Sequence, residues 1–285
     1  MEQEVLLELP PSVLPSYPTI KESWAALGWF LLGTILVALV VLVPVGALWH
    51  QQAQARQLTT AVVGEGGLLL TIWWLHRRAG PGRWPHLVWH KQALPWSLYA
   101  WLPVLAPAQA ILLTTLALLP LPNWMDKTFQ DWARYPVLAF GIGGIVGPVL
   151  EEYLFRGILL RGLLRNYRPW VAIGQSALLF GAFHFNPAQS VSAALMGLLL
   201  GWLYYRTQSL GLCMGLHALN NLFAFSMMRL SETSHYAALE NYQYAVGYWV
   251  LVVVAAGGVG AYLWQLNKLP LPPGAASAGP VAPQA

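Results

Sequence analysis

Residues 135–162 read YPVLAFGIGGIVGPVLEEYLFRGILLRG, an apolar stretch long enough to cross a bilayer, and Glu151, Glu152 and Arg156 interrupt it. A transmembrane helix needs about 20 mainly apolar residues. Each unpaired charge at the centre of a bilayer costs roughly 2.5–3.5 kcal/mol, so three would cost on the order of 8–10 kcal/mol. We therefore expect a polar site buried among transmembrane helices, whose other members lie elsewhere in the chain.

The composition is typical of a membrane protein. Of the 285 residues, 57% are hydrophobic and only 9% are charged, against about 25% charged in an ordinary soluble domain. The 15 Trp and 12 Tyr are residues that favour membrane–water interfaces. The single cysteine, Cys213, excludes an intramolecular disulfide. We attribute the net charge of +4 to loop residues that set orientation, and expect no nucleic-acid partner.

Eight apolar stretches predict an all-α fold, a polytopic transmembrane helix bundle. They cover about 24–48, 61–76, 96–120, 136–160, 169–185, 190–206, 209–229 and 245–265. The ends of the short second, fifth and sixth stretches are open to shifts of several residues. Three parts are expected: an N-terminal cytoplasmic segment (1–23), a membrane domain (24–268) and a disordered tail rich in Pro, Ala and Gly (269–285). The acidic N-terminal segment argues against a signal peptide.

Basic residues are distributed unevenly between the two sets of loops that alternate along the chain. Ten lie on the side of the N-terminus and four on the other side. The ten are Lys21, Arg77, Arg78, Arg83, Lys91, Arg161, Arg165, Arg168, Arg206 and Lys268. Because positive charge is retained on the cytoplasmic side, both termini are predicted to be cytoplasmic.

The two adjacent glutamates are expected to have different roles. Glu152 and Arg156 are four residues apart, with the acid first, which is the favourable order for an ion pair along a helix. Glu151 is rotated by about 100° from Glu152. Arg156 could therefore neutralise Glu152 and leave Glu151 to accept a proton. The alternative is a three-charge network that only holds helices together.

Two further stretches carry polar residues at helical spacing. Phe180 and His184 are four residues apart in one stretch, and His217 and Asn221 are four apart in another. Either histidine alone could be a packing residue that is hydrogen-bonded to a carbonyl. Together with the glutamates they form a set on three spans, and each spacing places its pair on one helix face. We expect these faces to converge.

These residues resemble the motifs of the CPBP family, which comprises CAAX proteases and bacteriocin-processing or immunity proteins and is also called the Abi family. The run EEYLFRG is similar to its EExxxR element, FGAFH to its FxxxH element and HALNN to its HxxxN element. The resemblance covers about residues 136–225, and it says nothing about the first three spans or the last one.

The resemblance implies an intramembrane glutamate endopeptidase. In that family's terms Glu151 would activate a water with help from His184, His217 and Asn221 would form an oxyanion site, and Glu152 and Arg156 would be supporting residues. Oxyanion stabilisation needs preorganised donors, which imidazole and carboxamide groups supply. No cofactor is expected. Zinc held by Glu151, His184 and His217 stays open as a minority alternative.

The function expected is hydrolysis of a peptide bond in a membrane-associated peptide or a lipidated protein, near the cytoplasmic face of a bacterial inner membrane. A non-catalytic immunity or peptide-binding protein is the competing class, and a transporter with a polar relay is a third. Glu65, in another apolar stretch, is expected to be structural, and Gln109 is expected to form an interhelical hydrogen bond. The substrate, metal dependence, oligomeric state and host stay open.

Overall fold

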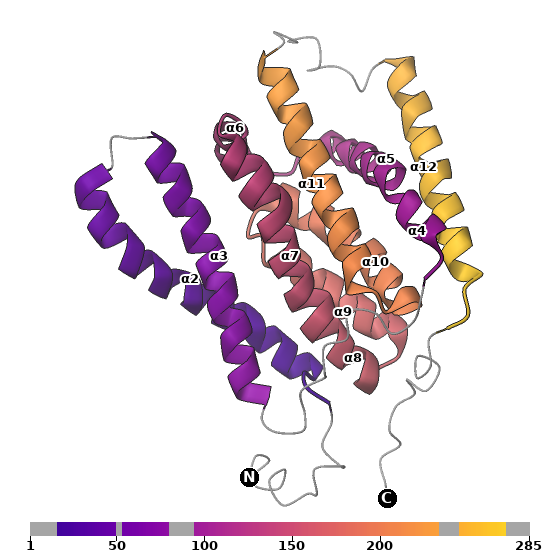
Figure 1. Ribbon diagram of the computed structural model, residues 1–285, viewed down its shortest axis with the longest axis horizontal. Coiled ribbons are helices and arrows are strands. Elements are labelled where there is room, and N and C mark those ends of the chain that lie inside the picture. The colour runs from indigo at the N-terminus through magenta and orange to yellow at the C-terminus, as the bar shows by residue number, and fades with distance from the viewer. Residues whose placement is uncertain (1–15, 50–52, 80–93, 234–244, 272–285) are drawn as a thin grey trace, which may run out of the picture.

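The computed structural model describes residues 16–49, 53–79, 94–233 and 245–271, and within these ranges its regular elements are all helical (Figure 1). The all-α prediction is thus confirmed. The elements are α2 (Ile20–Trp49), α3 (Ala53–Ala79), α4 (Trp96–Ala100), α5 (Leu102–Thr114), η1 (Thr115–Leu118), α6 (Asp126–Ala133), η2 (Val137–Val146), α7 (Gly147–Glu152), η3 (Tyr153–Leu160), α8 (Arg161–Asn166), α9 (Pro169–Ala182), α10 (Pro187–Thr207), α11 (Leu210–Thr233) and α12 (Val246–Asn267).

Each of the eight predicted apolar stretches is helical over most of its length, although several ends move. The second begins at Ala53 rather than near residue 61, and the third is divided, because α4 ends before Trp101 and α5 follows. Helix α6 was not predicted. Residues 1–15 of the N-terminal segment, 272–285 of the expected disordered tail and the basic loop residues Arg83 and Lys91 lie outside the described residues.

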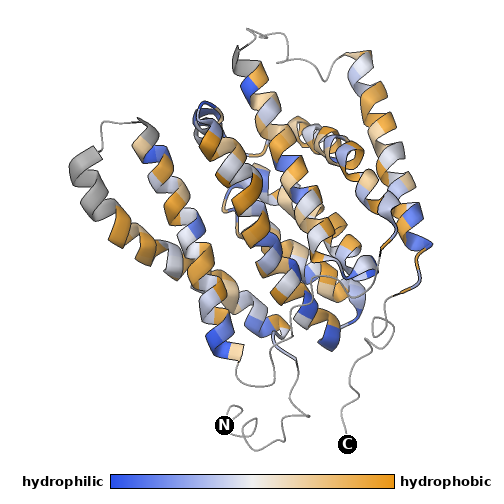
Figure 2. Ribbon diagram, viewed as in Figure 1, coloured by the Kyte–Doolittle hydropathy of each residue, from blue (hydrophilic) through white to orange (hydrophobic). Residues whose placement is uncertain are grey.

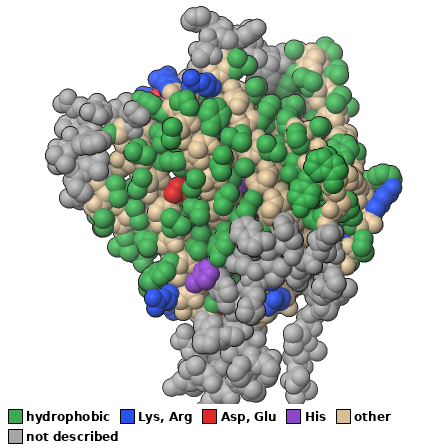
Figure 3. Space-filling model, in the orientation of Figure 1, with side chains coloured by type: hydrophobic (Ala, Val, Ile, Leu, Met, Phe, Trp, Pro, Cys, Tyr) green, Lys and Arg blue, Asp and Glu red, His purple; other side chains and the backbone are tan. Residues whose placement is uncertain are grey.

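Five helical segments of the described chain are long and apolar enough to cross a membrane. They are Ile20–Val41, Ala55–Ala79, Val137–Asn166, Leu210–Leu230 and Val246–Asn267. The protein is thus a multi-pass membrane protein, while eight crossings and the orientation stay predictions. Figure 2 shows apolar residues along most of each helix, and the face in Figure 3 is largely hydrophobic. Such a surface is suited to contact with lipid.

The helices are arranged around a central helical column formed by η2, α7, η3 and α8. Helices α2 and α3 pack as a pair, and α3 also contacts α7 (Figure 1). Helix α11 packs against α7 and η2 as well as α5, and α9 packs against η3 and α10. The column therefore touches the helices that carry the other motif residues.

Several segments that were predicted to lie on one side of the membrane meet at one end of the bundle. Asn166 accepts a hydrogen bond from the backbone N–H of Ser16, and Tyr167 accepts one from that of Ile20. Figure 1 places the start of α2 and the end of α12 at this same end.

The central column is not a uniform α-helix. Segments η2 and η3 are π-helical, and the six-residue α7 lies between them. A π-helix is wider than an α-helix and pairs residues five apart; it is found often at functional sites. Side chains in these two segments therefore do not follow the 100° rotation per residue that an α-helix predicts.

Candidate active site

The centre of the site is a buried network of three charged or titratable side chains. Arg156 donates to Oε1 of Glu152 at 2.6 Å, and both side chains are 0% exposed. His217 Nδ1 lies 2.8 Å from the same oxygen, so the imidazole donates its Nδ1 hydrogen to the carboxylate. Arg156 also donates to the backbone carbonyl of Gly197 on α10, and its guanidinium lies 4.7 Å from the ring centroid of Phe180. The predicted Glu152–Arg156 pair is present.

Glu151 lies on the other side of the same imidazole. Its Oε2 is 3.7 Å from Nε2 of His217, and its side chain is 27% exposed while that of His217 is 4% exposed. His217 thus lies between the two adjacent glutamates, with one ring nitrogen facing each. Glu152 is committed to its buried partners, whereas Glu151 reaches a more open environment in which water can contact it.

Asn221 is one turn beyond His217 on α11, and it is bonded to the central column. Its side-chain N–H donates to the carbonyl of Gly143 at 2.9 Å. In the π register this carbonyl would receive the N–H of Pro148, because Gly147 already donates to Ile142. Proline has no N–H, so the Asn221 amide satisfies an acceptor that the backbone cannot. Its second N–H makes no hydrogen bond with the described residues.

Gly143 also allows the close approach of α11 to the column. A Cβ atom on Gly143 would lie 2.7 Å from the Phe225 ring, closer than side-chain atoms pack. The absence of a side chain at this position therefore allows the packing of α11 that brings Asn221 and His217 to the glutamates.

His184 lies in the turn that follows α9, and the structure does not join it to Glu151. Its Nδ1 is 2.8 Å from the carbonyl of Phe180, which makes Nδ1 the protonated nitrogen and leaves a lone pair on Nε2. The Phe180 ring lies edge-on to both imidazoles, with centroids 5.2 Å from His184 and 5.7 Å from His217. Among the described residues no hydrogen bond or ion pair connects His184 with Glu151.

Zinc would need at least three of these side chains to direct their donor atoms at one point. No group of three or more His, Cys, Asp or Glu side chains in the described part of the chain is arranged to hold a metal ion. Nδ1 of His217 donates to Glu152, so only Nε2, which lies 3.7 Å from Oε2 of Glu151, could direct a lone pair at a metal. The three side chains named as possible ligands, Glu151, His184 and His217, do not form such a group among the described residues, and we derive no step through zinc.

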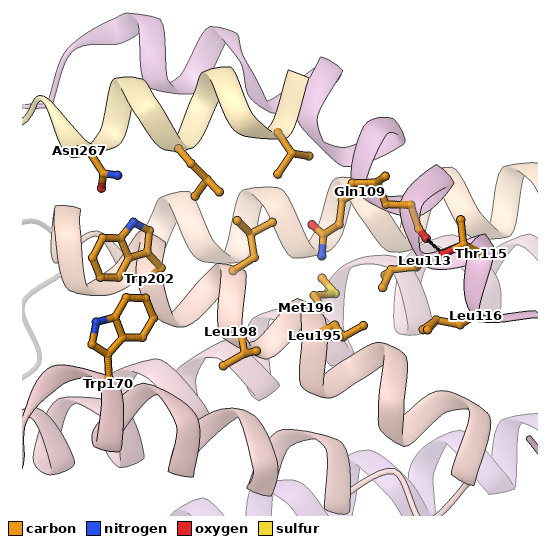
Figure 4. A pocket seen from close by; sticks show the side chains of 14 residues that line it. Gln109, Leu113, Thr115, Leu116, Trp170, Leu195, Met196, Leu198, Trp202 and Asn267 are labelled. Atoms are coloured by element: carbon orange, nitrogen blue, oxygen red, sulfur yellow. Dashed lines mark hydrogen bonds between the residues drawn. The ribbon is translucent and has the colours of Figure 1, made fainter. Parts of the chain in front are cut away.

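A separate cavity of about 540 Å³ lies between α5, α10 and α12, and it is lined almost wholly by apolar side chains (Figure 4). Stacked rings of Trp170 and Trp202 line one end, with centroids 4.7 Å apart. Gln109 points into the cavity and is 5% exposed, and neither its side-chain oxygen nor its nitrogen has a hydrogen-bond partner. The prediction that Gln109 forms an interhelical hydrogen bond is therefore wrong.

Comparisons with known proteins agree with the motifs. Residues 133–223 match the family model described as "Type II CAAX prenyl endopeptidase Rce1-like". A protein of Bacillus subtilis (strain 168) with the printed name "Putative membrane peptidase YdiL" is 28% identical over 102 residues, which make up 36% of this chain and 41% of that protein. The chain thus matches about two fifths of the length of this relative. No solved structure matches the chain at a significant level.

The matched region contains every motif residue from Glu151 to Asn221. The resemblance to the CPBP family is therefore confirmed for this segment, which is the one that contains the buried network. Helices α2, α3, α5 and α12 lie outside it.

Proposed function

We propose, from the match of residues 133–223 to the family model of Rce1-like type II CAAX prenyl endopeptidases, that this protein hydrolyses a peptide bond within the membrane. The observation that carries the proposal is the position of His217 between Glu151 and Glu152. One glutamate is fully buried and paired with Arg156, and its neighbour is partly exposed. This is the difference expected between a supporting residue and a general base.

In the proposed reaction the Glu151 carboxylate takes a proton from a water molecule. The water oxygen forms a bond to the carbonyl carbon of the scissile amide, and the carbonyl oxygen becomes an oxyanion. Glu151 then passes the proton to the amide nitrogen as the C–N bond breaks, which gives a carboxylic acid and an amine. A side chain that is 27% exposed can contact water and still lie in an environment less polar than bulk solvent.

His217 and Asn221 are proposed as the donors to the oxyanion. When His217 is protonated on both nitrogens, Glu152 accepts the Nδ1 hydrogen and the Nε2 hydrogen is directed toward Glu151, where the substrate would bind. Asn221 retains a second N–H beyond the one that Gly143 accepts. Preorganised donors of this kind contribute most in a water-poor site.

His184 is proposed to assist the attacking water. Its Nδ1–H is held by the Phe180 carbonyl, so its Nε2 lone pair can accept a hydrogen bond from water. A water between His184 and Glu151 would connect two residues that make no direct contact. The contribution of His184 should therefore be smaller than that of Glu151.

The proposed substrate is a membrane-associated peptide or a lipidated protein. The proposed location of the protein is a bacterial inner membrane, where it would cleave the substrate near the cytoplasmic face. Lipid surrounds the apolar surface. No cofactor is required in the proposed mechanism, since the proton transfers use only the side chains named above.

The test is a cleavage assay with the purified protein in detergent or nanodiscs against peptide libraries with and without a lipid chain. The wild-type protein should cleave a subset of these peptides, and the Glu151→Ala variant should cleave none of them. A chelator should leave the rate unchanged; if activity is lost and added zinc restores it, the metal-free mechanism is wrong. If Glu151→Ala and wild type behave alike, the protein is not a peptidase of this kind.

A further inference from the structure

Glu65 is an acidic residue of α3 whose carboxyl group packs against the helix that carries Glu151. A Cβ atom at position 147 would lie 3.1 Å from Oε1 of Glu65. The carboxyl group thus occupies the space left by the missing side chain of Gly147. Glu65 lies outside the segment that matches the peptidase family. The sequence around Glu65 did not predict its contact with Gly147.

The geometry of α7 brings this carboxyl group close to Glu151. Gly147 and Glu151 are four residues apart within α7, so they lie on the same helix face. Helical side chains lean toward the N-terminus of their helix, which directs Glu151 back toward the turn of Gly147. The Glu65 carboxyl group, which fills the space beside Gly147, therefore lies on the face of α7 that also carries Glu151.

One oxygen of Glu65 has no partner. Its Oε2 is buried and makes no hydrogen bond. An unpaired carboxylate oxygen in the interior of a membrane protein is costly. A proton on the carboxyl group removes the charge, and it also turns the group into a hydrogen-bond donor.

No cation among the described residues is placed to neutralise Glu65. The elements packed against α3 are chiefly α2, α6, α7 and η2. Val37 is the α2 residue beside Gly66, so the charged residues of α2, near its start, lie about four turns away. Asp131 of α6 accepts a hydrogen bond from Gln57, about two turns before Glu65. The titratable residues of these elements are Lys21, Glu22, Asp126, Lys127, Asp131, Glu151 and Glu152, and α3 itself carries Arg56, His76, Arg77 and Arg78 near its ends. Glu151 is also faced by His217 of α11, whose Nε2 lies 3.7 Å from its Oε2.

We propose that Glu65 is a positioning residue of the active site, which shares one proton with Glu151 and orients that carboxylate toward the attacking water. Two carboxyl groups that meet on one helix face in an apolar environment can hold one proton between them. The O–H of Glu65 donates to one oxygen of Glu151, and the other oxygen of Glu151 accepts the proton from water. The kinetic part of this inference rests on the proposed peptidase function; the shared proton does not.

The shared proton can be tested without any substrate, by infrared spectroscopy of the purified protein over a range of pH. Wild type should show the C=O band of a protonated carboxyl group, and Glu65→Gln should lose it. In Glu151→Gln the neighbouring negative charge is removed. If the two groups are coupled, the Glu65 band should disappear at lower pH than in wild type; if they are not coupled, its titration should be unchanged. Glu22→Gln, in α2, is the matched control and should leave the band unchanged.

Kinetics test the positioning role. Glu65→Gln should lower kcat by about 10- to 100-fold, because a small displacement of a catalytic group has an effect of this size, while KM changes little. It should also change the shape of the pH profile, since the proton that limits the alkaline side is absent. A role in packing alone would lower kcat equally at every pH.

The contact with Gly147 offers a second variant. Gly147→Ala should displace the Glu65 carboxyl group and lower kcat several-fold in the wild-type background. In a Glu65→Ala background the same change should have no further effect. Additive effects would contradict the contact, and an unchanged infrared titration in Glu151→Gln would overturn the shared proton. If wild type cleaves nothing, the peptidase proposal fails, and the infrared result still decides the present one.

Discussion

Two buried polar places in this bundle differ in how their side chains are paired. In the network of Glu152, Arg156 and His217, one carboxylate oxygen accepts hydrogen bonds from both of the other side chains. Only two buried atoms of this network, Oε2 of Glu152 and Nε of Arg156, lack a hydrogen-bond partner among the described residues. Across α10, in the cavity lined by α5, α10 and α12, the Gln109 amide has no partner for either polar atom. The two places are linked through α10, because Gly197 accepts from Arg156 and the adjacent Met196 lines the cavity.

The difference follows from charge. An unpaired buried charge is so costly that the fold must supply partners, and these fix the helices that provide them. A neutral amide without partners costs only about 1–3 kcal/mol. The first place should therefore be sensitive to single substitutions and the second tolerant, which the following predictions test from the largest effect to the smallest.

Glu151→Gln should reduce cleavage by about 10²- to 10⁴-fold, the usual contribution of a general base. The thermal stability should change little, because the side chain is partly exposed and lies outside the paired core. The measurements are kcat/KM with a cleavable peptide and the melting temperature in detergent. A large fall in the melting temperature would place Glu151 within the structural network and weaken the distinction between the two glutamates.

Arg156→Met should destabilise the fold by about 3–5 kcal/mol, since it leaves the Glu152 carboxylate buried without its partner. The change is measured as a shift in thermal or denaturant unfolding of the detergent-solubilised protein. The double variant Glu152→Gln with Arg156→Met should recover much of the loss, because no unpaired charge remains. An equal loss in single and double variants would show that packing, rather than charge, dominates at this place.

Asn221→Ala should destabilise the fold by about 1 kcal/mol, because it leaves the carbonyl of Gly143, which is partly buried, without its hydrogen-bond donor. Pro148→Ala restores a backbone N–H near this carbonyl. In the Pro148→Ala background the loss of stability on Asn221→Ala should therefore shrink, while any loss of cleavage should remain. The same stability cost in both backgrounds would argue against the substitution of a side-chain donor for the missing backbone N–H.

Gln109→Leu should leave the stability unchanged or raise it by about 1–2 kcal/mol, because it removes an amide that has no partner. Cleavage should be unaffected, since the cavity lies away from Glu151. The same unfolding and cleavage assays measure both. A clear loss of stability would mean that Gln109 is paired in the membrane and would remove the contrast between the two places.

Some of the site could be predicted from local spacing. The pair of Glu152 and Arg156 needed only their separation of four residues, and the two residues do meet at 2.6 Å. The side-by-side placement of His217 and Asn221 on α11 followed in the same way. Contacts between helices were less accessible: the expected meeting of His184 with Glu151 has no direct contact in the structure, and the proximity of Glu65 was missed.

The class of the protein and the residues that carry its motifs were determined by the amino-acid sequence alone, because apolar length and helical spacing are properties of the local chain. Only the tertiary structure decided that His217 lies between the two glutamates, that Asn221 satisfies Gly143, and that Glu65 packs beside Gly147. Each of these depends on the packing of separate helices against a column whose π-helical segments alter the side-chain directions. In each of these three contacts one partner lies on a different helix. The spacing of residues along a single helix does not predict which residue of another helix it will meet.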